Sequence, residues 1–406
     1  MELKYTFCTL FCLVLKIHAN AQAGCQDPLA INFNPNATST NSTCDYPTTN
    51  APLATRISSL PAILKESSAL LIVDGKVFTI NDSGNPADLF EIDSTTGQII
   101  KTTRIRNYSN TDWEDLAADS AHIYIGDFGN NNGSRTNLRI LKVRKSAVYN
   151  PDSVEINAER LNFNYPDQNT FIANSTHNFD CESLFFLGGR LHLFSKNRGN
   201  RKTKHYSLNP DLPSQTAILH DSLNANGLIT SGSVSKDGKI AALLGYDQAE
   251  VFVWILFGYE GTDFFGGNRR RIELPSFFLT GQAEGIGFVS NTKLWISNEA
   301  LGNILPMVKE LDISGYVNPI FTESPDLKTK ALHSNIYPNP ASDFISLKLQ
   351  KSEKFQILNP FGKLIMEGTE EIVDVSKLTS GLYFVKILNK EMNLTSMIQP
   401  LIIEHK

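Results

Sequence analysis

The chain has 406 residues, of which 41% are hydrophobic and 19% charged, with a net charge of −5. This length predicts two or three folded units at roughly 100–200 residues per domain, and the apolar share excludes disorder of the whole chain. The acidic balance argues against nucleic acid as the main partner, because phosphate binding requires a basic surface. No apolar run reaches the ~18 residues of a transmembrane helix, so we expect no transmembrane segment.

Residues 1–23 have the features of a secretory signal peptide. Lys4 precedes an apolar stretch at residues 7–15, and small residues follow in the pattern Ala19-Asn20-Ala21-Gln22-Ala23. This order of charge, apolar core and small residues predicts export from the cytoplasm and cleavage. A buried N-terminal helix is the alternative, but the apolar stretch is short and leads directly into cleavage-site chemistry.

Three cysteines remain after the signal: Cys25, Cys44 and Cys181. In an oxidising compartment, a disulfide between Cys25 and Cys44 closes a loop of about 20 residues and stabilises it by roughly 3 kcal/mol. We therefore expect a disulfide-closed segment at residues 24–54 and an unpaired Cys181. The polar side chains of the loop suit either calcium ligation or turn geometry. They are Asp27, Asn32 and Asn34.

Residues 55–320 contain short apolar runs separated by Gly, Asn, Asp and Ser, without a helical period. This pattern predicts antiparallel β structure. Similar short phrases recur along the segment, with anchors spaced by 48, 68, 48 and 54 residues. The anchors are Glu66, Glu114, Glu182, Thr230 and Glu284. Repeats of this length are typical of β-propeller blades. The predicted fold is therefore all-β, with a five-bladed propeller whose outer strand comes from residues 56–63, or six blades if residues 154–165 start their own sheet.

One mouth of such a propeller collects the loops that enter the innermost strands and those that leave the second strands. The predicted metal ligands there are Glu66, Glu114, Glu182, Glu284 and Asp127. The predicted substrate-binding residues are Lys196, Arg135, Asp82, Tyr246, Asn298 and Glu299. Converging carboxylates favour a bound cation, and oxygen-rich surroundings favour calcium. Basic groups can hold an anion such as phosphate. Alternatively, the repeated acids accept hydrogen bonds from neighbouring blades, because repeat proteins place the same structural residue in every unit.

The last part of the chain, residues 334–406 after a linker at 321–333, carries an ordered set of motifs. These are Pro338-Asn339-Pro340, the turn Gly362-Lys363 and the strand Gly381-Leu382-Tyr383-Phe384. Alternating apolar residues between them predict a small antiparallel sandwich. The motifs resemble the type A C-terminal sorting domain of the type IX secretion system. This resemblance implies an Ig-like β-sandwich, the type IX secretion machinery as a partner, and a secreted or outer-surface location. The sequence departs from the family after Asn389, where the basic final strand is missing.

The middle segment contains phrases with a second resemblance. Asp112-Trp113-Glu114-Asp115-Leu116-Ala117, residues 125–131 and Ala283-Glu284-Gly285-Ile286 look like the phytase-like and esterase-like β-propellers of secreted bacterial proteins. The resemblance implies a calcium-dependent phosphoesterase that acts at the propeller mouth. The alternative is a non-catalytic propeller that binds a glycan, peptide or surface partner. We expect a monomer with an extracellular ligand.

Histidine and serine chemistry have little support in the sequence. The eight histidines show no paired metal spacing, so His177 and His192 are interpreted as surface or packing residues. No Gly-x-Ser-x-Gly elbow occurs, which disfavours a serine hydrolase.

Overall fold

The computed structural model describes residues 23–27, 29–37, 44–248, 250–317, 336–347, 349, 353–359, 363–389 and 395–405. The chain divides into two units, Met1–Ser324 and Pro325–Lys406. The predicted signal peptide up to residue 22 and the predicted linker at 321–333 lie outside the described residues.

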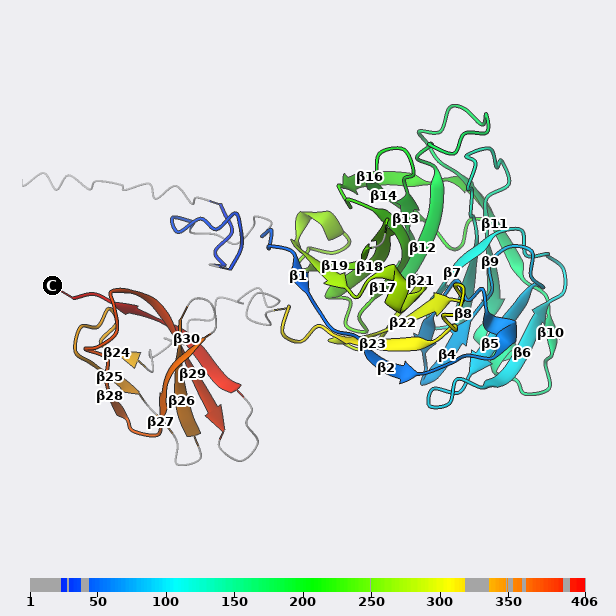
Figure 1. Cartoon of the computed structure of the whole chain (residues 1–406). Helices are drawn as coiled ribbons and strands as arrows, with labels where there is room; N and C mark the ends of the chain where they lie inside the picture. The colour runs from blue at the N-terminus through cyan, green and yellow to red at the C-terminus, as the bar shows by residue number, and fades with distance from the viewer. Residues whose placement is uncertain are drawn as a thin grey trace, which may run out of the picture. The chain divides into compact units, whose positions relative to one another are not determined.

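Five four- or five-stranded sheets make up the described part of the first unit (Figure 1). Blade 1 contains β3 (Leu71–Val73), β4 (Lys76–Thr79), β5 (Asp88–Ile92), β6 (Ile99–Ile105) and β10 (Glu155–Ile156). Blade 2 contains β7 (Trp113–Ala118), β8 (His122–Asp127), β9 (Arg139–Arg144), β11 (Glu159–Asn164) and β15 (Ser214–Thr216). Blade 3 contains β12 (Asp180–Leu187), β13 (Arg190–Lys196), β14 (Thr203–Leu208) and β16 (Ile218–Leu223). Blade 4 contains β17 (Leu228–Val234), β18 (Ile240–Asp247), β19 (Glu250–Phe257), β20 (Asn268–Leu274) and β1 (Thr49–Asn50). Blade 5 contains β21 (Gln282–Ser290), β22 (Lys293–Glu299), β23 (Val308–Asp312) and β2 (Ala54–Ile57).

The first strand of each blade lines the ring: β3, β7, β12, β17 and β21 contact one another from blade to blade. These sheets form a five-bladed propeller. Strand β2 closes the ring by pairing antiparallel with β23, although the predicted strand at 56–63 gives way to the short helix η1 (Ala62–Leu64). The segment at 154–165 adds outer strands to two existing blades, because β10 pairs with β6 and β11 pairs with β9. The six-bladed alternative is therefore excluded.

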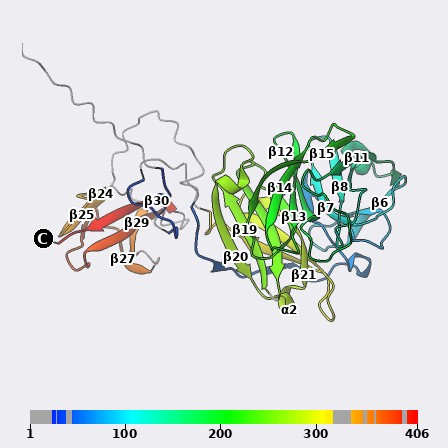
Figure 2. The same ribbon diagram turned by 90° about the horizontal axis from the view of Figure 1, so that it is seen from above.

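Apolar layers fill the space between neighbouring blades. Val253 of blade 4 packs in one cluster with Ile296 of blade 5, and Tyr124 of blade 2 packs in another with Leu193 of blade 3. Side chains point alternately to the two faces of a strand, and a neighbouring blade covers each face of a sheet. The strands are therefore apolar on both faces. This explains the continuous apolar runs in the sequence. Three further short helices occupy loops: α1 (Lys145–Tyr149), η2 (Phe264–Gly266) and α2 (Phe277–Thr280), with α2 at one end of the strands in Figure 2.

The segment before the propeller docks on blade 4. Cys25 and Cys44 form the predicted disulfide, and Cys181 is free and buried. The Cys44 carbonyl accepts a hydrogen bond from the Arg269 N–H at 3.0 Å, and Tyr46 stacks on a phenylalanine of β19. Each of the three polar residues proposed for calcium or turns accepts a backbone N–H through its side chain: Asp27 and Asn34 do so within local turns, and Asn32 accepts from the distant Asp45.

The second unit is a sandwich of two small sheets. One contains β24 (Ile336–Tyr337), β25 (Phe344–Leu347) and β28 (Ile372–Asp374), and the other contains β26 (Glu353–Leu358), β27 (Leu364–Gly368), β29 (Gly381–Asn389) and β30 (Thr395–Ile403). Ile345 and Val373 of the first sheet share a buried core with Phe355 and Val385 of the second. The small antiparallel domain is thus confirmed, and an Ig-like topology stays a prediction. None of the helices in the described part of the chain has the length and hydropathy needed to cross a bilayer.

Candidate metal site at the channel mouth

The recurring residues of the sequence lie at β-bulges in the innermost strands. In blade 2, Trp113 pairs with Asp127 and Asp115 pairs with Gly126, so Glu114 is the extra residue. The same irregularity occurs at Glu182, Thr230 and Glu284. A bulge re-aims the side chain of its extra residue. In each of these blades, the same β-bulge therefore sets the direction of the side chain at the equivalent position.

Blade 1 follows the same pattern but in a different register from the predicted one. Ser67 bridges to Asn81, which corresponds to the pairing of the residue before each bulge in the other blades. Ser68 therefore occupies the bulge position, and its hydroxyl donates to the Trp113 carbonyl at 3.0 Å, as the Thr230 hydroxyl donates to the Ala283 carbonyl at 2.8 Å. Glu66 lies two residues earlier, and the predicted alignment of this blade is wrong by that amount.

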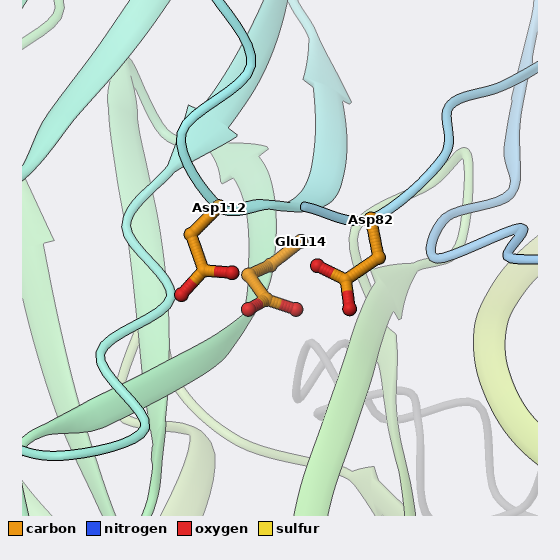
Figure 3. A group of neighbouring side chains, drawn as sticks. All are labelled: Asp82, Asp112 and Glu114. Atoms are coloured by element: carbon orange, nitrogen blue, oxygen red, sulfur yellow. The ribbon is translucent and has the colours of Figure 1, made fainter. Parts of the chain in front are cut away.

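Three carboxylates converge at the mouth between blades 1 and 2 (Figure 3). Asp82 follows β4, Asp112 precedes β7, and Glu114 is the bulged residue of β7. One oxygen of each lies within 4.8 Å of the others. Asp112 is 9% and Glu114 5% exposed. The spacing and the burial together make these oxygens a candidate cation site.

In the described part of the chain, hydrogen-bond donors reach the two aspartates but not the glutamate, and the Ser83 side chain bonds to Asp112. Asp82 accepts a hydrogen bond from the backbone N–H of Ser83, whereas among the described residues we find no hydrogen bond or ion pair to the Glu114 carboxylate. Gly129 faces the cluster: a Cβ atom at this position would lie 1.9 Å from Glu114 Oε1 and 2.4 Å from Asp112 Oδ2. The two carboxylates can therefore approach the backbone this closely only because residue 129 has no side chain.

Burial and mutual repulsion make these acids hard to ionise. Burial, followed by the charge of Asp82, raises the pKa of Asp112 to about 7. Burial, followed by the charges of Glu182 and Asp82, raises the pKa of Glu114 well above its usual range. Burial also raises the pKa of Asp82, although Lys196 acts in the opposite direction. A dication among the three would favour their charged forms.

The other predicted metal ligands are placed differently. Glu182 forms a buried ion pair with Lys196, and Glu284 accepts a hydrogen bond from Gln282 at 2.7 Å. Asp127 is fully buried, and its two oxygens meet Arg135 at 3.0 Å and Arg139 at 2.7 Å. Asp127 is therefore already neutralised by two guanidinium groups, and the structure does not bring it into the cluster.

The strand-pairing register separates the predicted substrate-binding residues into two groups that face opposite ways. Lys196, Tyr246 and Glu299 each pair with the residue two positions before the bulge, and Asp82 follows Asn81 at the equivalent place. Asn298 lies one residue earlier, and its amide bonds to the carbonyls of Glu299 and Leu305, which is a structural role. Since side chains alternate along a strand, adjacent residues face opposite ways.

The basic groups near the mouth already have partners. The Lys196 ammonium, besides its ion pair with Glu182, lies 5.3 Å from the centre of the Tyr246 ring. Arg135 donates to the Gly129 carbonyl at 2.7 Å, which holds the loop against the acidic cluster. Burial, followed by the charges of Glu284 and Asp82, raises the pKa of Glu299 to about 9. Positive charge is present beside the mouth, but in ion pairs and hydrogen bonds.

Comparison with known proteins identifies the second unit. A family model described as the secretion system C-terminal sorting domain matches residues 335–404. The C-terminal unit is a type IX secretion sorting domain. The protein is accordingly secreted to the outer surface or the extracellular medium. No curated protein matches the chain.

Solved structures resemble the chain at low identity. A putative 6-phosphogluconolactonase from Bacteroides uniformis shares 15% identity with a TM-score of 0.36, over 84% of this chain and 89% of that one. The WD40 repeats of RRP9 share 9% with a TM-score of 0.34, over 64% and 99%. The hydrazine synthase of Kuenenia stuttgartiensis shares 12% with a TM-score of 0.31 over 60% of this chain, which spans 58% of that protein's length. The propeller architecture follows from the sheets themselves, and these similarities assign no activity.

Proposed function

We propose that the channel mouth binds one calcium ion through Asp82, Asp112 and Glu114, and that this exported propeller is a calcium-dependent phosphoesterase. The supporting observation is the Glu114 carboxylate, which is buried, has no partner among the described residues, and packs against Gly129, where a side chain would not fit. Buried charges in proteins are paired or coordinate metals. A donor set made only of carboxylate oxygens suits calcium better than the softer transition metals.

The rest of the mouth is suited to an anionic ester. A calcium ion at the cluster would hold a phosphoryl oxygen and lower the pKa of a coordinated water. Lys196 and Arg198 place positive charge on blade 3, where Arg198 pairs with Asp180 at 2.8 Å. Burial and neighbouring acids raise the pKa of Glu299 to about 9 in the calcium-free protein, and the protonated form of this acid would donate a proton to the leaving oxygen.

The test uses the secreted full chain with phosphomonoester and phosphodiester substrates, in calcium and in chelator. We expect turnover that requires calcium and is lost in Glu114→Gln. Glu310→Gln is the control, because Glu310 pairs with Lys293 on an outer strand. Calcium binding without turnover of either substrate would refute the phosphoesterase but keep the metal site, whereas no calcium binding would refute both.

Exposed apolar side chains favour a second candidate, a non-catalytic propeller that binds a peptide or surface partner. They are Ile63 at 56%, Phe278 at 72%, Leu279 at 67% and Leu305 at 57% exposed. Their loops enter β3 and β21 or leave β22, which places them at the mouth end of blades 1 and 5. This candidate predicts no turnover, with or without bound calcium, and peptide binding that falls in Phe278→Ser.

A further inference from the structure

A second cluster of polar side chains lies in the outer part of blade 3, away from the carboxylates of the mouth. A cavity of about 310 Å³ is lined by His205, His220, Asp221, Thr262 and Asp263. The first three come from the paired strands β14 and β16, and the last two from the loop between β19 and β20 of blade 4. His205 pairs directly with Asp221, and the register shift that follows makes His220 a bulge residue. The cavity therefore joins two blades.

A chain of hydrogen bonds fixes the tautomer of His205. His192 Nε2 is 3.1 Å from the Leu187 carbonyl, which only accepts, so this nitrogen carries a proton. His192 is fully buried, and with its proton on Nε2 the neutral ring accepts through Nδ1. His205 Nε2 lies 2.9 Å from that Nδ1 and therefore donates. The Nδ1 atom of a neutral His205 is left as a lone pair.

That lone pair faces another acceptor. His205 Nδ1 lies 3.5 Å from Asp221 Oδ1, and both atoms are buried without a hydrogen-bond partner. Two facing acceptors are unfavourable unless a cation lies between them. Two ligands of a tetrahedral zinc ion, at about 2.0–2.1 Å from the metal, are about 3.3 Å apart. The observed separation is close to this value.

We propose that this cavity binds a divalent transition metal of the zinc class, with His205 Nδ1 and an Asp221 oxygen as ligands. His220 and Asp263 line the same cavity, but among the described residues no third carboxylate oxygen or ring nitrogen lies within 4.8 Å of both ligand atoms, so water would fill the remaining positions. The bond from His205 to His192 is the second contact that metal-binding histidines make through their other nitrogen. Phe194 stacks on the His205 ring at 5.0 Å and Phe264 meets it edge-on at 5.1 Å, so the ligand is held in orientation.

The ligand types separate this site from the mouth. An imidazole nitrogen favours zinc over calcium, whereas the mouth offers oxygens only. The site is independent of the proposed phosphoesterase activity.

The experiment is a calorimetric zinc titration of the secreted full chain, carried out in saturating calcium so that the mouth is occupied. Cobalt absorption in the visible range serves as a second readout of four-coordinate geometry. The variants are His205→Gln and Asp221→Asn. Asp221 has a side chain that is 34% exposed, so its substitution is compatible with folding, which circular dichroism checks.

The control is His122→Gln, which alters another histidine–aspartate pair. His122 Nδ1 lies 3.3 Å from Asp119, but Asp119 already accepts hydrogen bonds from the Tyr124 hydroxyl and two backbone N–H groups. We expect one zinc site in the wild type and the control, with affinity at least about tenfold weaker in both variants. No zinc binding by the folded wild type, or equal affinity in both variants, would overturn the proposal and leave a proton between His205 and Asp221.

Discussion

Glu114 and Glu182 occupy the same bulge position in neighbouring blades, and their replacement by glutamine should have opposite effects on stability. Glu182 is paired with Lys196 in the protein interior, whereas no described residue pairs with the Glu114 carboxylate. Removing one partner of a buried ion pair costs about 3–5 kcal/mol, because the other charge is left unpaired. Removing a buried carboxylate that has no partner relieves its desolvation, by about 1–3 kcal/mol.

Calcium should stabilise the wild type but not the Glu114 variant. At a calcium concentration of 100 times Kd, binding to the folded state adds about 2.7 kcal/mol of stability. At about 2–4 °C per kcal/mol for a domain of this size, the melting temperature of the wild type should rise by about 5–10 °C. Glu114→Gln should melt above the wild type in chelator and show almost no shift in calcium.

The assay is thermal unfolding of the secreted full chain and the two variants, followed by circular dichroism in chelator and in calcium. The propeller transition is the one that is compared. A full calcium shift in Glu114→Gln would refute the ligand assignment. A loss of stability in chelator as large as that of Glu182→Gln would show that Glu114 has a partner, and would refute the reasoning from its burial.

Four further predictions concern Gly129, the pH dependence of stability, the disulfide and the sorting domain. Gly129→Ala should abolish the calcium shift in melting temperature, because its Cβ would collide with the carboxylates of Glu114 and Asp112 and displace them. Gly315→Ala, which meets nothing within 4 Å, should leave the shift unchanged. Raised pKa values at Asp112 and Glu114 mean that the folded state favours the protonated acids. The stability of the calcium-free propeller, measured by urea unfolding, should therefore fall from pH 5 to pH 8, while its calcium affinity rises. A stability that does not change with pH would contradict this. Replacing the disulfide cysteines with serine should speed amide exchange at Arg269, because its N–H donates to the Cys44 carbonyl. The melting temperature of the propeller should not fall. Unchanged exchange would show that the disulfide does not hold this contact. A chain ending at residue 317 should remain in the periplasm when fractions are blotted, and its appearance in the medium would show that the sorting domain is dispensable.

The periodicity of the sequence predicted the blades but not the register within each blade. Glu66 was aligned with Glu114, although Ser68 occupies that position. A shift of two residues keeps the same face of a strand directed inward, so alternation of apolar and polar residues does not distinguish the two registers. The pairing of Ser67 with Asn81 decides between them, and it depends on contacts within the folded sheet.

The sequence also predicted only some of the residues that form the metal site. Asp127 was predicted as a ligand and Asp112 was missed, although the Asp112-Trp113-Glu114 phrase had been noticed. Which of these acids enters the mouth depends on the strand pairing around the bulge, since neighbouring residues face opposite ways. The histidines of blade 3 show no metal spacing in the sequence, because strand pairing rather than helical spacing brings His205 beside Asp221.

Calorimetric titration of calcium into the secreted full chain, with phosphoester turnover followed in the same samples, tests the central claim most directly. The expected result is one calcium ion bound by the wild type and by Glu310→Gln, none by Glu114→Gln, and turnover that follows occupancy. Absence of binding to the folded wild type, or equal affinity in Glu114→Gln, would contradict the calcium site. The acids of the mouth would then have a structural role, and the exposed apolar rim would point to a binding function.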